Sequence, residues 1–302
     1  MITKPTVLVL GAGASIPYGF PSGLGLLRII DKKLEPNSSG NFIKILKEFS
    51  ISEDEIRTFR YDLINSNVPS VDAFLEHRPE FLKLGKLVIT LTLMPFEEEH
   101  VLSIIANREQ SWYAYLFNKL NARFDAFTEN KVSIITFNYD RSIEHFLFKA
   151  IKCKYGKSDE ECADKLSKMP IIHVHGRLGT LPWQGGKGRP YSPRSDLLKP
   201  EEIENICEQI IVISEAEDTS SEFRDAFNLM KVADFLYFLG FGFHEMNLHR
   251  LKINEVHFPT IKGTGHGLGD AEIHAITNKW RIDFPYPSLK VLEFLKNCAQ
   301  LS

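Results

Sequence analysis

The stretch VLVLGAGAS, residues 7–15, decides the fold of this chain. Four apolar residues are followed at once by two glycines and a serine, an order typical of a buried strand, a tight turn and the approach to a helix. Glycines let the backbone approach a pyrophosphate, and amides at a helix start favour its negative charge. Ile16 stands where the dinucleotide-binding pattern has its third glycine. From the motif alone, a tight turn without a ligand is an equally good interpretation.

Four further apolar runs predict strands, at residues 132–137, 171–174, 210–213 and 234–239. Helical patterns separate them, with one helix after Gly23 and another from Glu272 through Trp280. Strands that are apolar throughout and alternate with helices predict an α/β fold, a Rossmann-like, doubly wound, mostly parallel sheet. Between about 41 and 127, apolar residues recur three or four apart without a strand pattern. We interpret 41–130 as a helical insertion or cap within one domain spanning 1–302.

Composition narrows the class of protein. A length of 302 residues suits one large domain, or a core domain with an insertion, and 43% of the residues are hydrophobic. The formal net charge of -3 argues against nucleic acid as the main ligand. No apolar stretch approaches the roughly 20 residues of a membrane span, and none resembles a signal peptide, so we expect a cytoplasmic protein. The four cysteines form no C-x-x-C pair, which argues against a zinc ribbon.

Polar or glycine-rich signatures follow four of the five predicted strands, at residues 11–15, 138–140, 175–176 and 240–242. Ligands of parallel sheets bind beyond the carboxyl ends of the strands, so we expect these four stretches to meet in one crevice. Asn138 can hydrogen-bond a ribose hydroxyl or position a water, and Asp140 can fix Asn138. Both residue types are also common in turns that bind nothing.

His173 and His175 flank Val174, so strand alternation places both histidines on one face unless the strand ends between them. Neither has a cysteine or acidic neighbour at metal-ligand spacing, which argues against a metal site. A histidine at the mouth of a strand can act as a general base near neutral pH, or can simply cap the strand end. The loop at 181–200 carries Trp183, Lys187, Arg189 and Arg194. These side chains could contact a phosphate or a partner, or the loop could simply be solvated.

Taken in order, these stretches resemble the sirtuin-like family, the prokaryotic relatives of sirtuins. The turn at 11–15 resembles the family's G-A-G-x-S, and His175-Gly176 resembles its catalytic H-G. Gly240-Phe241-Gly242 stands where sirtuins have a ribose-binding G-[TS]-S turn, from which Phe241 departs. The other matching segments are Gly19-Phe20-Pro21, Ser70-Val71-Asp72-Ala73-Phe74-Leu75, Thr136-Phe137-Asn138-Tyr139-Asp140 and, on the adenine side, Gly265 to Glu272.

Two departures argue against deacylation, and the first is the long helical stretch before residue 130, which differs from the layout of a sirtuin. The second is the lack of a zinc module. Sirtuin deacylases carry a four-cysteine zinc module between the His-Gly motif and the next strand, where this chain has only Cys207. The groove for an acyl-lysine peptide lies against that module. Sirtuin-like proteins without the module are associated with NAD hydrolysis in bacterial defence against phage. The resemblance therefore implies an NAD⁺ glycohydrolase that needs no metal, an NAD-depleting antiviral effector activated by a protein partner or by homo-oligomerisation.

The resemblance also implies roles for individual residues. The pyrophosphate of NAD would be held by Gly11, Ala12, Gly13 and Ser15. Asn138 would bind the nicotinamide ribose or orient a water, Asp140 would support Asn138, and His175 would bind a ribose hydroxyl or act as general base. The expected nucleotide-binding set further includes Phe20, Pro21, Asp72, Gly240, Phe241 and Gly242. NADP, an ADP-ribosyltransferase or deacylase that uses the same pocket, and a non-catalytic module that senses NAD or ADP-ribose all remain open.

Overall fold

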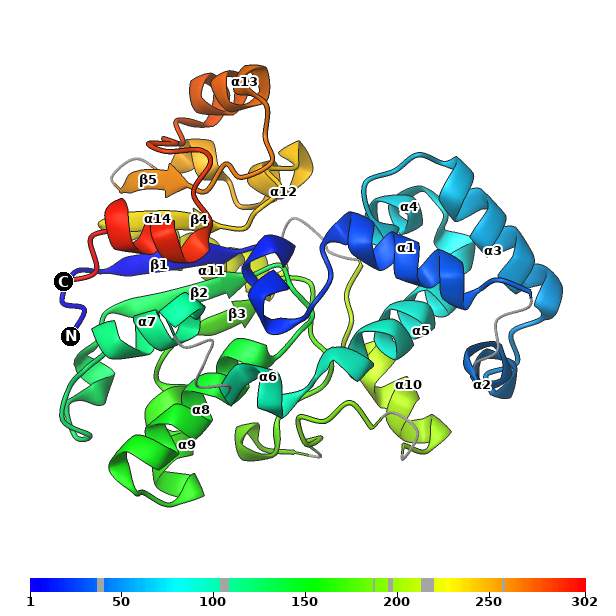
Figure 1. The fold of residues 1–302 in the computed structure, drawn as a ribbon, viewed down its shortest axis with the longest axis horizontal. Coiled ribbons are helices and arrows are strands. Elements are labelled where there is room, and N and C mark those ends of the chain that lie inside the picture. The colour runs from blue at the N-terminus through cyan, green and yellow to red at the C-terminus, as the bar shows by residue number, and fades with distance from the viewer. Residues whose placement is uncertain (37–40, 104–108, 187, 195–197, 213–219, 257–258) are drawn as a thin grey trace.

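The computed structural model describes the chain apart from residues 37–40, 104–108, 187, 195–197, 213–219 and 257–258. Its five strands form one parallel sheet in the order β3-β2-β1-β4-β5 (Figure 1). This confirms the predicted α/β, Rossmann-like fold. The chain order reverses beside β1, so the switch point where such sheets bind ligands lies between β1 and β4. The strands are β1 Thr6–Leu10, β2 Val132–Thr136, β3 Ile171–His173, β4 Phe235–Leu239 and β5 Thr260–Gly263.

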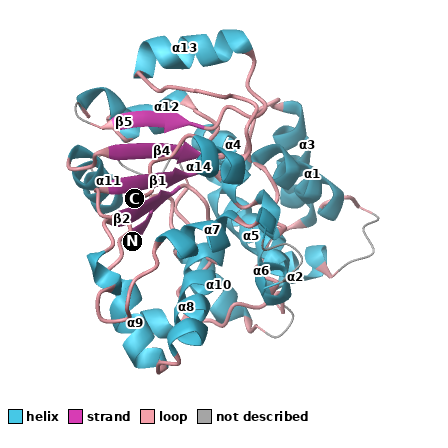
Figure 2. Ribbon diagram, turned by 60° about the vertical axis from the view of Figure 1, so that its left-hand side comes forward, coloured by secondary structure: helices cyan, strands magenta, loops and turns pink. Residues whose placement is uncertain are grey.

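Both faces of the sheet are covered by helices, and the alternation along β1 shows how. Val7 and Val9 pack into one core together with Phe223 of α11 (Ser221–Lys231). Leu8 and Leu10 point to the opposite core, which includes residues of α7 (Trp112–Lys119), α8 (Ser142–Tyr155) and α14 (Val291–Asn297). The five residues of β1 are all buried, as expected for a central parallel strand. Figure 2 shows the strands stacked between these helical layers.

The described residues between β1 and β2 form helices and no strand, as the periodicity predicts. In Figure 1, α1 to α5 cluster beyond the end toward which the strands point. Nine residues of α5 are buried, and Cys207 of α10 contacts Thr90 of α5 at 3.3 Å. The helices are α1 Gly23–Lys33, α2 Phe42–Glu48, α3 Glu53–Asn65, α4 Val71–His77, α5 Leu82–Leu93, α6 Glu99–Ser103, α9 Asp159–Ser167, α10 Pro200–Glu208, α12 Glu245–Arg250 and α13 Asp270–Trp280.

The structure differs from the predicted strands in two places, one strand that does not form and one that was not predicted. The run predicted at 210–213 forms no strand in its described part: Ile210 makes an isolated antiparallel bridge with Gly176, and residue 213 lies outside the described residues. Ile210 and Val212 are nevertheless buried in the core on one face of the sheet. Strand β5 escaped prediction because TIKG, at the sheet edge, carries one large apolar residue. The helix predicted after Gly23 is α1, and the late helix is α13.

Within the described residues, each helix is too short or too polar to cross a bilayer.

Candidate functional site

The glycine-rich turn after β1 packs directly against the turn after β4. The Gly11 amide donates to the Leu239 carbonyl at 3.0 Å, and the Gly13 amide donates to the Gly240 carbonyl at 2.9 Å. A Cβ on Gly11 would lie 2.6 Å from the Gly240 oxygen, and a Cβ on Gly240, whose φ is 58°, would lie 2.1 Å from the Ala14 nitrogen. The contact between the turns therefore requires these glycines, whether or not a nucleotide binds.

Asn138 reaches this turn from the end of β2. Its side-chain amide donates to the Gly11 carbonyl and to Ser15 Oγ, at 3.0 Å each. Ser15 Oγ in turn donates to Asp140 Oδ2 at 2.7 Å. Asp140 thus supports Asn138 through Ser15, and not by direct contact. Burial raises the pKa of Asp140, while hydrogen bonds from Ser142 and Ser15 oppose that rise. The ends of two neighbouring strands are joined by one buried polar network.

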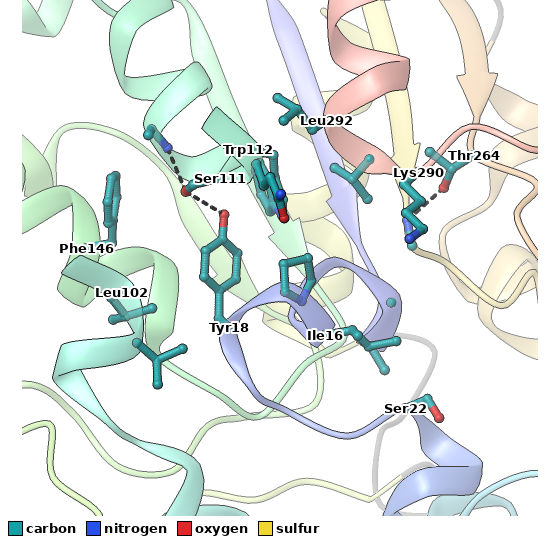
Figure 3. A pocket seen from close by; sticks show the side chains of 18 of the residues that line it. Ile16, Tyr18, Ser22, Leu102, Ser111, Trp112, Phe146, Thr264, Lys290 and Leu292 are labelled. Atoms are coloured by element: carbon teal, nitrogen blue, oxygen red, sulfur yellow. Dashed lines mark hydrogen bonds between the residues drawn. The ribbon is translucent and has the colours of Figure 1, made fainter. Parts of the chain in front are cut away.

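A cavity of about 1790 Å³ opens beside this network (Figure 3). Figure 3 shows Tyr18 and Trp112 between Phe146 and Leu102 on one side and Thr264 and Lys290 on the other. Ligand pockets commonly hold roughly 300–1,000 Å³, so a dinucleotide would leave part of this space unfilled. Of the residues predicted to bind nucleotide, the cavity is lined by Ala12, Gly13, Gly240, Phe241 and Gly242.

Trp112 and Tyr18 hold the wall of the cavity in place. The Trp112 indole donates to the Ala14 carbonyl at 2.8 Å, and Tyr18 stacks on Tyr113 with 3.7 Å between ring centroids. The Tyr18 hydroxyl accepts from the Tyr113 amide at 2.8 Å and lies 3.1 Å from Ser111 Oγ. Burial raises the pKa of Tyr18, against the effect of these hydrogen bonds, so the hydroxyl is neutral. The sequence offered no functional signal for this wall, since its aromatic residues follow ordinary helical spacing.

His175 lies apart from the cavity lining, with 4% of its surface exposed. Its ring meets Phe137 and Phe223 edge-on, at centroid distances of 5.3 and 5.8 Å. Burial, with a contribution from the charge of Arg250, lowers its pKa to about 4 despite the nearby Asn247 side chain. Neither ring nitrogen has a hydrogen-bond partner of good geometry among the described residues. His175 is therefore neutral at pH 7 and carries two unused polar atoms at a strand end.

His173 and His175 point to different surroundings, because β3 ends at His173 and the strand alternation stops there. His173 Nδ1 lies 3.0 Å from the Asn138 carbonyl, and Nε2 lies 2.7 Å from Glu144 Oε1. The sequence predicts both histidines on one face of the sheet unless the strand ends between them. The strand does end between them, so they lie in different places.

Three further predicted residues, Phe20, Pro21 and Asp72, contact other parts of the protein or are simply packed. Asp72, in the first turn of α4, accepts a hydrogen bond from the Tyr139 hydroxyl, and burial raises the pKa of Asp72. Phe20 is buried, with its ring 6.2 Å from that of Phe96, and Pro21 is half-buried. Gly11, Ser15, Phe20, Pro21, Asp72, Asn138, Asp140 and His175 are outside the cavity lining in this conformation.

Sequence reasoning left out Thr264 and Lys290, which line the cavity beyond β5 and before α14. His266, also in the lining, belongs to the segment assigned to the adenine side. Thr264 Oγ1 accepts from the Gly240 amide at 2.8 Å and so ties the β5 end to the β4 turn. The polar, glycine-containing stretch after β5 has the same signature as the other strand ends. The sequence does not identify this stretch as a strand end, because β5 itself has no strand pattern. Gly265, the start of the segment assigned to the adenine side, directly follows Thr264, and Gly267 and Leu268 from it line the cavity.

The loop at 181–200 includes a buried ion cluster in its described part. Arg189 and Arg141 both contact Glu97 Oε2, at 2.5 and 2.7 Å, and the side chains of Arg141 and Glu97 are fully buried. Trp183 stacks on Phe148 with 5.0 Å between centroids. Arg189 and Trp183 therefore hold the loop against α8 and are not solvated; Lys187 lies outside the described residues.

In the part of the chain that the structure describes, no group of three or more His, Cys, Asp or Glu side chains is arranged to hold a metal ion. No family model and no curated protein matches this chain. The features that bear on its function are therefore the fold, the polar network and the cavity.

Proposed function

We propose that this chain binds NAD⁺ across the carboxyl edge of its sheet and hydrolyses it to nicotinamide and ADP-ribose. The observation that carries the proposal is the network of Asn138, Ser15 and Asp140, anchored on the Gly11 turn at the switch point of the sheet. The adjoining cavity is large enough for a dinucleotide and mostly apolar in its lining side chains. By its resemblance to sirtuin-like proteins without a zinc module, the chain would deplete NAD in defence against phage.

Hydrolysis of NAD⁺ requires few catalytic groups, because nicotinamide is a good leaving group. The bond between C1′ and the nicotinamide nitrogen breaks, its electron pair stays on nicotinamide, and the cationic ring leaves neutral without an acid. Water adds to C1′ of the oxocarbenium-like centre and loses one proton. Asn138 would orient that water or the ribose, since fixed polar groups lower the reorganisation needed in the transition state. A neutral His175 would accept the proton or bind a ribose hydroxyl.

One observation favours a second candidate, a module that binds NAD or ADP-ribose without turnover. Asn138, Asp140 and His175 are outside the cavity lining, and the Asn138 amide donates to groups of the protein itself. A nucleotide could fill the cavity without meeting these side chains in this conformation. For hydrolysis, the turn after β1 must shift when nucleotide binds or when a partner or a second copy activates the chain.

Incubation of the purified chain with NAD⁺ tests both candidates. We expect nicotinamide and ADP-ribose to appear in equal amounts, and Asn138→Ala to slow their release by at least about 100-fold, the scale of losing one transition-state group. Asn121→Ala, on an exposed residue, is the matched control and should behave as the parent chain. Unchanged turnover in Asn138→Ala would sink the assignment. Tight ADP-ribose binding with no turnover, also at high protein concentration, would favour the sensing module. Nicotinamide release only with an acceptor would point to a transferase or deacylase.

A further inference from the structure

His173, which the proposed chemistry does not use, lies directly behind Asn138. Its side chain is 95% buried, and its two ring nitrogens face the Asn138 carbonyl and Glu144 Oε1, at 3.0 and 2.7 Å. A backbone carbonyl can only accept a hydrogen bond, so Nδ1 must carry a proton. Nε2 is then the nitrogen that pairs with Glu144.

Glu144 faces that nitrogen from the first turn of α8, where the helix dipole favours negative charge, and its side chain is fully buried. Burial by itself raises the pKa of Glu144, but the charge and hydrogen bond of His173, its own backbone amide and the charge of Arg177 outweigh that effect and lower it. At 2.7 Å, Nε2 and Oε1 are joined by one hydrogen bond, so the ring is held at both of its nitrogens.

We infer that His173 is a positioning residue whose ring, paired with Glu144, holds the main chain of Asn138 from behind. The 2.7 Å separation to Glu144 is in the range of a charge-assisted hydrogen bond. The Asn138 amide is fixed as well, because it donates to Thr136 Oγ1 at 3.0 Å. The side chain of Asn138 is thus aimed at the Gly11 turn from a main chain held at both its amide and its carbonyl.

The charges around the pair come from three elements. Glu144 belongs to α8, Arg177 follows β3, and Asp140 precedes α8 and repels Glu144. Glu144 Oε2 has no hydrogen-bond partner among the described residues, so the carboxylate is compensated mainly by the His173 ring and by Arg177. Replacing the carboxylate with an amide exchanges this acceptor for a neutral group and should loosen the hold of the ring on Asn138.

Glu144→Gln and His173→Gln test the inference, with Glu160→Gln on the exposed face of α9 as the matched change of charge. In ¹⁵N-histidine NMR, we expect Nδ1 of His173 to carry a proton in the parent chain. In Glu144→Gln the ¹³C shift of the Asn138 carbonyl should move. His173→Gln assigns the signals. A Nδ1 without a proton in the parent chain overturns the inference, as does an unmoved Asn138 carbonyl in Glu144→Gln.

The kinetic part of the inference rests on the proposed NAD hydrolysis. His173 is outside the cavity lining, so kcat should fall about fivefold to tenfold in Glu144→Gln while KM for NAD⁺ changes less than about twofold. A rise in KM alone, or no change in kcat, contradicts the positioning role. If the parent chain releases no nicotinamide, the proposed function fails, and the NMR result still decides the inference.

Discussion

Gly240 and Gly242 are two residues apart in the turn after β4, but only Gly240 lacks room for a side chain. A Cβ on Gly240 would collide with the Ala14 nitrogen, and its φ of 58° disfavours any side chain. A Cβ on Gly242 would meet nothing within 4 Å. We expect Gly240→Ala to lower the free energy of unfolding by more than about 2 kcal/mol and Gly242→Ala to change it by less than about 1 kcal/mol. Urea unfolding of both variants measures the difference, and equal midpoints would contradict the contact between the turns.

His175 makes stability depend on pH. Its pKa is about 4 in the folded chain against an ordinary value of 6.5. Above pH 6.5 the ring is neutral in both states; below it, the unfolded chain binds a proton that the folded chain does not. The free energy of unfolding should therefore fall as the pH drops from 6.5 toward 4, by at most about 3 kcal/mol from this group.

The matched variants for this prediction are His175→Phe, which keeps an aromatic ring beside Phe137 and Phe223, and His274→Gln on the exposed face of α13. Denaturant unfolding between pH 7.5 and 4.5 should give a shallower pH slope for His175→Phe than for the parent chain, while His274→Gln keeps the parent slope. Parallel slopes for all three chains would show that His175 is not buried as a neutral ring.

At the scale of elements, one buried carboxylate joins three segments. Glu97, just before α6, pairs with Arg141 at the start of α8 and with Arg189 in the loop at 181–200. Arg141 also donates to the carbonyls of Thr180, Arg189 and Pro190. The loop is thereby fastened next to Asp140, which is in the polar network of the site.

Removing that carboxylate leaves two cations in a buried space. We expect Glu97→Gln to lower the free energy of unfolding by about 3–5 kcal/mol, the usual cost of breaking a buried pair from one side. Glu98→Gln alters a neighbour whose side chain is 43% exposed and should cost less than about 1 kcal/mol. Chemical unfolding measures both, and limited proteolysis within 181–200 should accelerate only in Glu97→Gln. Similar losses in both variants would argue against a fastening role.

At the scale of the whole molecule, the cavity should make stability depend on nucleotide. A ligand at about 100 times its Kd stabilises a folded chain by about 2.7 kcal/mol. ADP-ribose, the product of the proposed reaction, should therefore raise Tm by several degrees in a thermal melt, and ribose 5-phosphate, which lacks the adenosine half, should raise it less. An unchanged Tm with millimolar ADP-ribose would contradict nucleotide binding in either proposed form.

The order of β1, the turn and the later strands could be predicted from the sequence, because a strand buried on both faces must be apolar at every position. The helical character of 41–127 could be predicted as well. A helix buried along one side must carry apolar residues three or four positions apart. Strand β5 and the run at 210–213 could not be assigned, since an edge strand needs few apolar residues and an apolar run can be buried in the core without joining a ladder.

The strand ends in the sequence already place Asn138 and Asp140 at the carboxyl edge of the sheet, but not the contact between them. That contact depends on the tertiary structure. Ser15, 125 positions from Asp140 in the chain, links Asp140 to Asn138, and Glu144 of α8 pairs with His173 of β3. Strand periodicity is a local property, whereas the partner of a buried polar group depends on which elements pack together. That packing separates His175 from His173 and gives the two histidines different surroundings.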